Sequence, residues 1–253
     1  MSSDFCLKIL TYNIHKGFGY TTRLTLADMR TQLHEVGADI VCLQEIQEEH
    51  QSRLKRHQEW PIEGQLQYLA RGLWPHYAYG KNAIYNAGHH GNALLSKYSF
   101  ARWENIKLNR LPMFSRGLLH GVIYLSPIKK PLHVICFHLG LTQHMRNWHA
   151  HRLCEYIKGS IEPQDALIVA GDSNDFFQNL SHYFDEDLGL KEAHKQIHGF
   201  YARSFPSIFP MLALDRIYVR GLEPIESRTL GGKKWHFLSD HLPLYTELKW
   251  TGA

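Results

Sequence analysis

Residues 166–174 read ALIVAGDSN, an apolar run that ends directly in polar residues. The apolar part, residues 166–170, is typical of a strand buried on both faces. Asp172 and Asn174 follow it at a spacing of two. A carboxylate held by a rigid strand end is well positioned, as metal and phosphate chemistry requires, although Asp and Asn also form ordinary turns after strands. The rest of the chain decides between the two interpretations.

Strands dominate the elements that the sequence predicts around this stretch. Alternating or apolar runs predict strands at residues 8–14, 38–43, 77–80, 93–96, 101–108, 118–125, 132–139, 217–219 and 242–248. Apolar residues at helical spacing predict helices at residues 24–36, 63–73 and 143–157, with Gly37 as the stop signal of the first. Many strands with few helices indicate two sheets packed face to face and covered outside by helices, rather than a doubly wound parallel sheet.

Length and composition are those of one ordinary globular domain. The 253 residues are 44% hydrophobic and 21% charged, and no linker, repeat or low-complexity segment divides them. We therefore expect a single domain over residues 1–253. Its apolar runs have the length of strands and are too short to span a bilayer.

The N-terminus and the cysteines indicate a cytoplasmic protein. Residues 1–5 lack the basic stretch followed by an apolar one that begins a secretory signal. Cys6, Cys42, Cys136 and Cys154 form no close pair in the sequence, so reduced thiols are expected. The formal charge of +4 suits a phosphate-bearing substrate but comes without the basic runs of a nucleic-acid coat. We expect a monomer.

Polar side chains recur at the ends of the predicted strands. Each is by itself a common turn residue, but six such sites on one chain share one chemistry. They are Asn13 with His15, Glu45, His138, Asp172 with Asn174, Asp215, and Asp240 with His241. A hard cation such as Mg²⁺ prefers carboxylates and other oxygen ligands, and Glu45 suits that role. The set predicts a metal-assisted phosphate site.

Several other kinds of site are excluded because their patterns are missing. The Cys/His spacing of a structural zinc site is absent. No Gly-x-Ser-x-Gly elbow and no phosphate-cradling glycine-rich loop occurs, and Gly17-Phe18-Gly19 is too short a match to indicate one.

Seven short motifs, in order from the first predicted strand to the last, resemble those of the endonuclease/exonuclease/phosphatase superfamily. They are Thr11-Tyr12-Asn13-Ile14, Leu43-Gln44-Glu45, Gly91-Asn92-Ala93-Leu94-Leu95-Ser96, His138-Leu139, Gly171-Asp172-Ser173-Asn174, Leu214-Asp215-Arg216-Ile217-Tyr218 and Ser239-Asp240-His241. One tripeptide alone is weak evidence, whereas seven in the family's order are strong. The stretches at residues 13–17 (NIHKG) and 88–92 (GHHGN) are similar in particular to small, stand-alone bacterial members of the YbhP type.

The resemblance implies an α/β fold, a four-layer α/β/β/α sandwich with two packed mixed β-sheets. It also implies a divalent cation, Mg²⁺ with Mn²⁺ as a substitute. Glu45 would be the principal metal ligand, with Asn13 near the metal or a phosphate oxygen and Asp240 close to a metal-bound water. The resemblance leaves open whether one metal ion or two take part.

The remaining motif residues would carry the chemistry, which is in-line attack of water on a phosphoester. Asp172 would orient or deprotonate the water, and Asn174 would hold the water or the phosphate. His241, hydrogen-bonded to Asp215, would face the phosphoryl group as a cation, and His138 would donate to a non-bridging oxygen. Either Asp172 or His241 could be the general base.

A further three motif residues are expected to contact the substrate, and two positions depart from the family's pattern. The expected substrate contacts are Asn92, Arg216 and His15. Ser173 stands where an aromatic residue is frequent, and it is expected to point away from the site. The predicted helix after His138 carries the usual arginine, Arg146, but has His149 in place of a glutamine, which puts one supporting contact in doubt.

The substrate is where the sequence leaves the most open, because a shared centre does not fix what it cleaves. A phosphodiester of a nucleic acid or a phospholipid head group is the first expectation. A phosphomonoester, or a catalytically silent binding module that keeps the fold, is the alternative. Residues 82–90 could form a flap, in which His89 and His90 are expected to pack rather than to bind metal. The aromatic-rich residues 199–214 either pack beneath Asp215 or form an apolar rim for a lipid tail or a stacked base.

Overall fold

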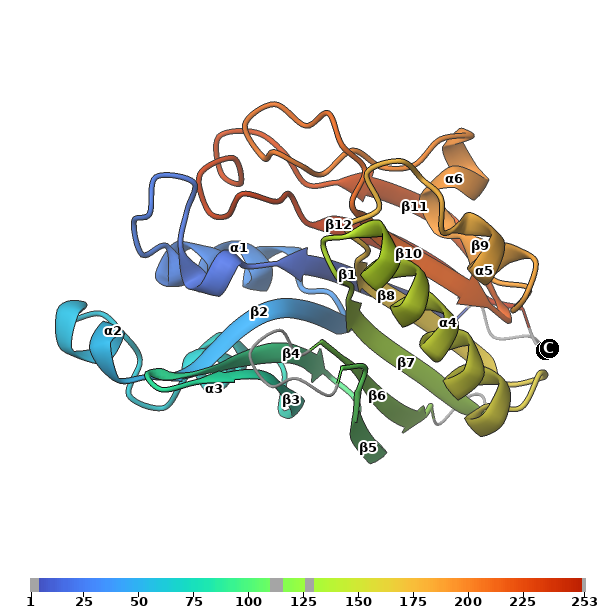
Figure 1. Cartoon of the computed structure of the whole chain (residues 1–253), viewed down its shortest axis with the longest axis horizontal. Helices are drawn as coiled ribbons and strands as arrows, with labels where there is room; N and C mark the ends of the chain where they lie inside the picture. Colours follow the sequence, from blue (N-terminus) through green and yellow to red (C-terminus); the bar gives the residue numbers. More distant parts are fainter. Residues whose placement is uncertain (1–4, 110–115, 126–129, 252–253) are drawn as a thin grey trace.

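Two six-stranded sheets stack face to face, with helices on their outer faces (Figure 1). The structure, a computed structural model, describes residues 5–109, 116–125 and 130–251. The expectation about residues 1–5 therefore lies, except for Phe5, outside the described residues. No helix in the described part of the chain is long and apolar enough to cross a membrane.

The first sheet joins both ends of the described chain. Its strands are β1 (Cys6–Asn13), β2 (Ile40–His50), β3 (His76–Tyr85), β4 (Gly88–Ser96), β11 (Leu222–Thr229) and β12 (Leu244–Trp250). They lie in the order β11-β12-β1-β2-β4-β3. The first strand pairs in parallel with β2 and antiparallel with β12, so the N-terminal strand is central rather than at an edge.

The second sheet holds the strands from the middle of the sequence. They are β5 (Phe100–Lys107), β6 (Gly117–Tyr124), β7 (Pro131–His138), β8 (Ala166–Asp172), β9 (Lys191–Glu192) and β10 (Asp215–Arg220), in the order β5-β6-β7-β8-β10-β9. The parallel pairing of β7 with β8 sets His138 beside Asp172, and the antiparallel pairing of β10 with β8 sets Asp215 on the other side of Asp172.

The helices form the outer layers. They are α1 (Leu26–Val36), α2 (Gln51–Arg56), α3 (Gln65–Ala70), α4 (Gln143–Ser160), α5 (Ser181–Asp185) and α6 (Ala193–His198), with a short 3₁₀ turn at His15–Gly17. The predicted stop of α1 is confirmed, because Gly37 adopts a left-handed φ of 61° and its N–H bonds the carbonyl of Leu33. Thr142 caps α4 by accepting the N–H of Met145.

Three hydrophobic clusters hold the four layers together. The middle cluster lies between the sheets and includes Ile9, Leu94, Val134 and Ile168. A second cluster joins the first sheet to α1 and α3, and a third joins the second sheet to α4 and α5. This arrangement confirms the predicted four-layer sandwich of two mixed sheets.

The alternation of side chains along a strand decides which polar residues reach the space between the sheets. In β8, Ala166, Ile168 and Ala170 belong to the middle cluster, so Asp172 continues the same face. The same two-residue step carries the middle-cluster face of β1 to Asn13, that of β7 to His138 and that of β10 to Asp215. Four polar side chains therefore meet between the sheets at one end of the sandwich.

One expectation about the first sheet is wrong. Glu45 does not end its strand, because β2 continues to His50 after a bulge between Leu43 and Ile46. Residues 82–90 belong to the hairpin in which β3 pairs with β4. Strand β11 was not predicted, because its alternation is broken by Pro224 and a register shift.

Candidate active site

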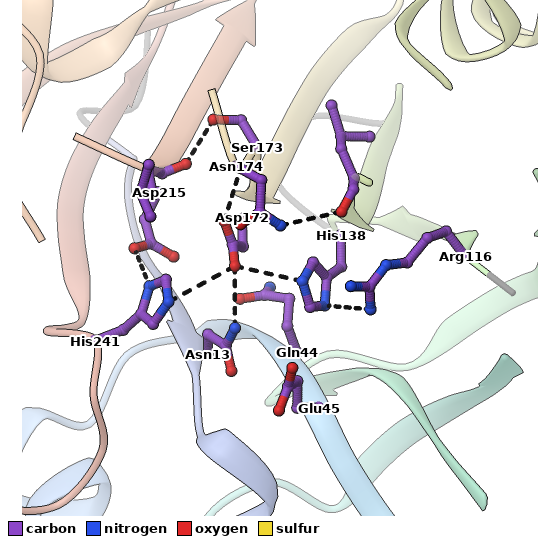
Figure 2. Close-up of polar contacts among 12 residues, drawn as sticks. Asn13, Gln44, Glu45, Arg116, His138, Asp172, Ser173, Asn174, Asp215 and His241 are labelled. Carbon is purple, nitrogen blue, oxygen red and sulfur yellow. Dashed lines mark hydrogen bonds and ion pairs between the residues drawn. The ribbon is translucent and has the colours of Figure 1, made fainter. Parts of the chain in front are cut away.

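The carboxylate of Asp172 is the centre of the polar residues at this end of the sandwich (Figure 2). Its Oδ1 accepts the backbone N–H of Asn174 at 2.9 Å, and its Oδ2 accepts the side-chain amide of Asn13 at 3.0 Å. The Nε2 atoms of His138 and His241 lie 3.4 and 3.8 Å from the same Oδ2. Asp172 is thus surrounded by hydrogen-bond donors from both sheets while almost completely buried.

The imidazole of His241 is held between two carboxylates. Its Nδ1 lies 2.8 Å from Oδ2 of Asp215, and its Nε2 faces Asp172. The hydroxyl of Ser204 donates to the same Oδ2 of Asp215 at 2.6 Å. Ser204 was missed in the sequence, where a serine ten residues before the motif carries no signal of its own. These contacts fix the orientation of the ring and leave Nε2 as the atom directed at the cavity.

The surroundings of Asp172 and His241 raise the pKa of each residue, for different reasons. Burial lowers the pKa of His241, but Asp215 and Asp172 outweigh it and raise the value to about 10. Burial also raises the pKa of Asp172, to about 6, against the attraction of His241. At neutral pH the pair is therefore an imidazolium beside an ionised carboxylate.

His138 and Arg116 form the opposite wall. The guanidinium Nη1 of Arg116 lies 3.3 Å from Nδ1 of His138. Burial, together with the nearby Arg116 cation, lowers the pKa of His138 well below its ordinary value, so the ring is neutral. Since a guanidinium can only donate, Nδ1 accepts and the proton sits on Nε2, toward Asp172. Arg116 was missed in the sequence because no motif includes it.

Glu45 stands at the bulge of β2 with its carboxylate directed into the cavity (Figure 2). Burial raises its pKa, but the charge and hydrogen bond of the Lys16 ammonium, together with the neighbouring histidines, outweigh burial, and the value falls to about 2. Lys16 Nζ lies 3.0 Å from Oε2 of Glu45, yet this buried oxygen has no well-directed hydrogen bond among the described residues. An ionised carboxylate with an incompletely satisfied buried oxygen fits a divalent cation.

One other group of the described residues offers possible metal ligands. Asp172, Asp215 and His241 offer ligand atoms within 4.8 Å of one another. Both nitrogens of a cationic imidazole carry protons, however, so His241 cannot ligate in this state. Asn13 uses both ends of its amide, because Oδ1 also accepts the N–H of His15 at 3.0 Å. The oxygens of Glu45, with Asn13 and Asp240 beside the same cavity, remain the better donor set.

Four residues that carry side chains adopt left-handed backbone at the rim of this site. Their φ values are 46° at His15, 59° at Lys16, 60° at Glu45 and 50° at Asn174. Such conformations are uncommon outside glycine and cost roughly 1–3 kcal/mol each. Strained backbone gathered around one cavity is typical of functional sites.

A cavity of about 230 Å³ unites most of the predicted site residues. It is lined by Asn13, His15, Glu45, His138, Asp172, Asn174, Asp240 and His241, together with Arg116, Leu141, Phe176, Phe205 and Leu214. Asp215 lies behind His241 and orients it. We call this space the catalytic cavity.

Two of the expected substrate contacts, Arg216 and Asn92, do not line the catalytic cavity. Arg216 is only 2% exposed, and its guanidinium packs 4.1 Å from the ring centre of Tyr201. It directly follows Asp215 on β10, so strand alternation turns it away from the space between the sheets. Asn92 does face that space, but its amide donates to the carbonyls of Gly117 and Cys136 and thereby ties the two sheets together.

The residues at the two departures from the family's pattern, Ser173 and His149, both form hydrogen bonds with the backbone. Ser173 points away from the cavity, as expected, and its hydroxyl donates to the carbonyl of Leu214. The guanidinium of Arg146 donates to the carbonyl of Leu141 at 2.5 Å. At the other departure, the Nδ1 of His149 accepts the N–H of Gly140 at 3.1 Å.

Residues 199–214 were expected either to pack beneath Asp215 or to form an apolar rim, and the segment has both buried and exposed apolar side chains. Tyr201 is buried, whereas Phe200, Phe209 and Met211 are largely exposed. Phe205 packs 5.0 Å, between ring centres, from His241. The segment also lines a second cavity of about 920 Å³, which shares Phe176 with the catalytic cavity.

Comparison with known proteins places the chain among related sequences and folds. Residues 10–241 match the model of the Endonuclease/Exonuclease/phosphatase family. Over 248 residues the chain is 38% identical to YbhP of Escherichia coli K12, a match that covers 98% of each protein.

Solved structures with low sequence identity share the fold. An endonuclease/exonuclease/phosphatase of Beutenbergia cavernae has a TM-score of 0.75 at 15% identity, over 97% of this chain and 72% of that one. A mannosyl-6-phosphatase of Bacteroides thetaiotaomicron has a TM-score of 0.70 at 16% identity, covering 96% and 99% of the two chains. A humanized D. rerio TDP2 has a TM-score of 0.68 at 19% identity, covering 96% and 98%.

Proposed function

The chain belongs to the Endonuclease/Exonuclease/phosphatase family, and from that membership we propose that it is a divalent-metal-dependent phosphodiester hydrolase. Members of the family are hydrolases that act on phosphoester bonds. One observation carries the proposal for this chain. An ionised Asp172, a cationic His241 and the under-coordinated Glu45 line the same cavity.

Glu45 would hold the cation, Mg²⁺ or in its place Mn²⁺, with Asn13 and Asp240 beside it. When bound, a divalent ion neutralises negative charge on phosphoryl oxygens. Lys16, which now faces Glu45, would move aside. Its side chain is 28% exposed and therefore has solvent to move into.

Asp172 is the proposed proton acceptor. Its pKa of about 6 leaves it ionised at neutral pH, whereas His241, with a pKa of about 10, already carries its proton. The water oxygen would form a bond to phosphorus as Asp172 takes its proton and the ester oxygen leaves with the bonding electrons. The leaving oxygen would then gain a proton from solvent.

The cations and donors of the cavity would stabilise the charge that this step develops. Nε2–H of His241, held by Asp215, and Nε2–H of His138 both point toward Asp172, where the phosphoryl oxygens would lie. Arg116 adds a fixed positive charge beside His138. Donors positioned in advance in a buried site are worth more than in water.

The substrate proposed is a diester of a nucleic acid or a phospholipid head group. A diester is favoured over a monoester because the catalytic cavity adjoins the second cavity at Phe176, which gives room to a second ester group. The proposal includes one domain for the whole chain, supported by the pairing of β1 with β12. It also includes a cytoplasmic monomer.

The test is hydrolysis of bis(4-nitrophenyl) phosphate and of 4-nitrophenyl phosphate with Mg²⁺, Mn²⁺ or EDTA. We expect metal-dependent cleavage of the diester, abolished by EDTA. Losses of roughly a hundredfold or more are expected for Glu45→Gln, Asp172→Asn and His241→Asn. Arg152→Gln, on the exposed face of α4, serves as the control. Unimpaired turnover in Glu45→Gln or Asp172→Asn would sink the proposal, and faster cleavage of the monoester would replace diesterase by phosphatase.

A further inference from the structure

The second cavity lies between α6 and the end of β11, two elements that pack against each other (Figure 1). Residues 199–203 and 210–213, from the segment before β10, also line it. At about 920 Å³ it has the size of a pocket for a small organic ligand. In the function proposed above it serves only as room for a second ester group, and its side chains have no assigned role.

The charge of this cavity is one-sided. Lys195, Arg203 and Arg228 line it, and among the described lining residues there is no Asp or Glu. Arg203 is exposed and has no ion pair or hydrogen bond with the described residues. Arg228 pairs with Glu226 at 2.8 Å, and Lys195 stacks over Tyr201. A concave surface with an excess of positive charge attracts an anionic group.

A flat apolar surface stands beside these cations. The ring of Phe200 is 61% exposed, although it is supported on one side by His194 and His198 at 5.5 and 5.9 Å between ring centres. His198 is itself fixed, because its Nε2 donates to the carbonyl of Ser227 at 2.8 Å. An exposed aromatic ring on a rigid support, next to cations, is the arrangement that stacks a nucleobase and binds its phosphate.

The second cavity continues from the catalytic one. Phe176 lines both, and successive residues of one segment divide between them, with Ala213 in the second cavity and Leu214 in the first. The guanidinium of Arg146 stacks over Phe176 at 5.6 Å from the ring centre and steadies the boundary. A ligand anchored at Asp172 and His241 can therefore extend past Phe176 toward Phe200.

We propose that the second cavity binds the nucleotide next to the scissile phosphate of a single-stranded nucleic acid. Phe200 stacks its base, and Arg203 with Lys195 binds its phosphate. A phospholipid head group and a sugar phosphate both carry an anion that the cations could bind, but neither has a flat aromatic ring to stack on Phe200. This inference rests on the proposed hydrolase function and names its substrate.

The test is binding of a fluorescently labelled single-stranded oligonucleotide to the full-length Asp172→Asn protein, followed by anisotropy. We expect Phe200→Ala to weaken binding roughly fivefold to a hundredfold, the range for one stacked base, and Arg203→Ala to weaken it less as salt rises. Phe177→Ala and Lys191→Ala, exposed residues outside the cavity, are the matched controls. AMP should compete better than ribose 5-phosphate, and both better than inorganic phosphate.

A kinetic comparison separates this inference from the proposed function. In the otherwise wild-type protein, Phe200→Ala should raise KM for the oligonucleotide more than Phe177→Ala does, while metal-dependent cleavage of bis(4-nitrophenyl) phosphate persists because Glu45, Asp172 and His241 are intact. Equal affinities of Phe200→Ala and Phe177→Ala, or AMP competing no better than inorganic phosphate, would overturn the nucleotide site while diesterase activity stands. Failure to cleave any phosphoester would overturn the proposed function itself.

Discussion

Because His241 keeps its proton, His241 and its neighbour Asp172 have different roles in the catalytic cavity. Asp215 and Asp172 lie on either side of the ring, and each favours its charged form. A ring that keeps its proton can only donate, so the neighbouring carboxylate is left to accept a proton from water. The question that the sequence left open, which of the two is the base, is thereby answered in the proposal in favour of Asp172.

The pH profile of diester cleavage should be bell-shaped. Activity should fall on the acid side as Asp172 is protonated, at or somewhat below its pKa of about 6, because a bound cation would stabilise the carboxylate. It should fall on the alkaline side as His241 loses its proton, near pH 10. The measurement is kcat/KM from pH 4 to 11 with Mn²⁺ held constant. A profile that climbs steadily through pH 10 is incompatible with a cationic His241.

Lys16 should compete with the metal ion for Glu45. Lys16→Met removes the ammonium that faces Oε2 at 3.0 Å, so the affinity for Mn²⁺ should rise. A partly exposed ion pair of about 1 kcal/mol corresponds to roughly a fivefold change in Kd. Isothermal titration of Mn²⁺ into the protein measures this without turnover, and Lys191→Met is the control. Weaker Mn²⁺ binding by Lys16→Met would show instead that the lysine supports the site.

At the scale of elements, the alternation of side chains along the strands brings the site residues to the same space between the sheets. Once β10 is known to put Ile217 between the sheets, Asp215 must share that face and Arg216 must lie opposite. Asp215 and Arg216 were both predicted to be site residues because they belong to one motif. Strand alternation alone predicts that their side chains point to opposite faces of the sheet. Glu45 is the converse case, since only the bulge in β2 turns it to the cavity, and a bulge leaves no clear mark in the sequence.

The close approach of β7 and β8 should make Gly171 irreplaceable. A Cβ at this position would lie 1.9 Å from the carbonyl oxygen of Phe137, and φ there is 155°. Gly171→Ala should therefore lower the free energy of unfolding by about 3 kcal/mol, because the strands beside His138 and Asp172 must separate. Gly159→Ala, in α4 with open space around it, should instead stabilise by about 0.5–1 kcal/mol. Urea denaturation of both variants checks the difference, and equal stabilities would refute it.

At the scale of the whole molecule, the motif order and strand count were enough to predict the sandwich, whereas the arrangement around the site was not. Arg116 lies just before β6, which pairs with β7, and Ser204 reaches the site through its hydrogen bonds with Asp215. Neither belongs to a motif. The second cavity arises in the same way, since α6 and β11 come together only in the folded chain.

The two sheets should unfold together. The first sheet takes strands from both ends of the described chain and the second takes those between, so the first sheet cannot form from a continuous piece of sequence, and the middle cluster buries one face of each sheet against the other. Gln44 adds a buried link, because its amide donates to Thr11 in its own sheet and to Cys136 Sγ in the other. Differential scanning calorimetry of the metal-free protein should show one transition, with equal calorimetric and van't Hoff enthalpies. Two resolved transitions would contradict a single domain.

The left-handed backbone at His15, Lys16, Glu45 and Asn174 affects how this protein would respond to directed evolution for thermal stability. Glycine adopts these angles without strain, so replacing any of the four relieves a local cost of roughly 1–3 kcal/mol. A library selected for survival at high temperature alone would accumulate glycines at the mouth of the catalytic cavity. The most stable variants would lose activity, so the selection has to require catalytic turnover and thermal stability together.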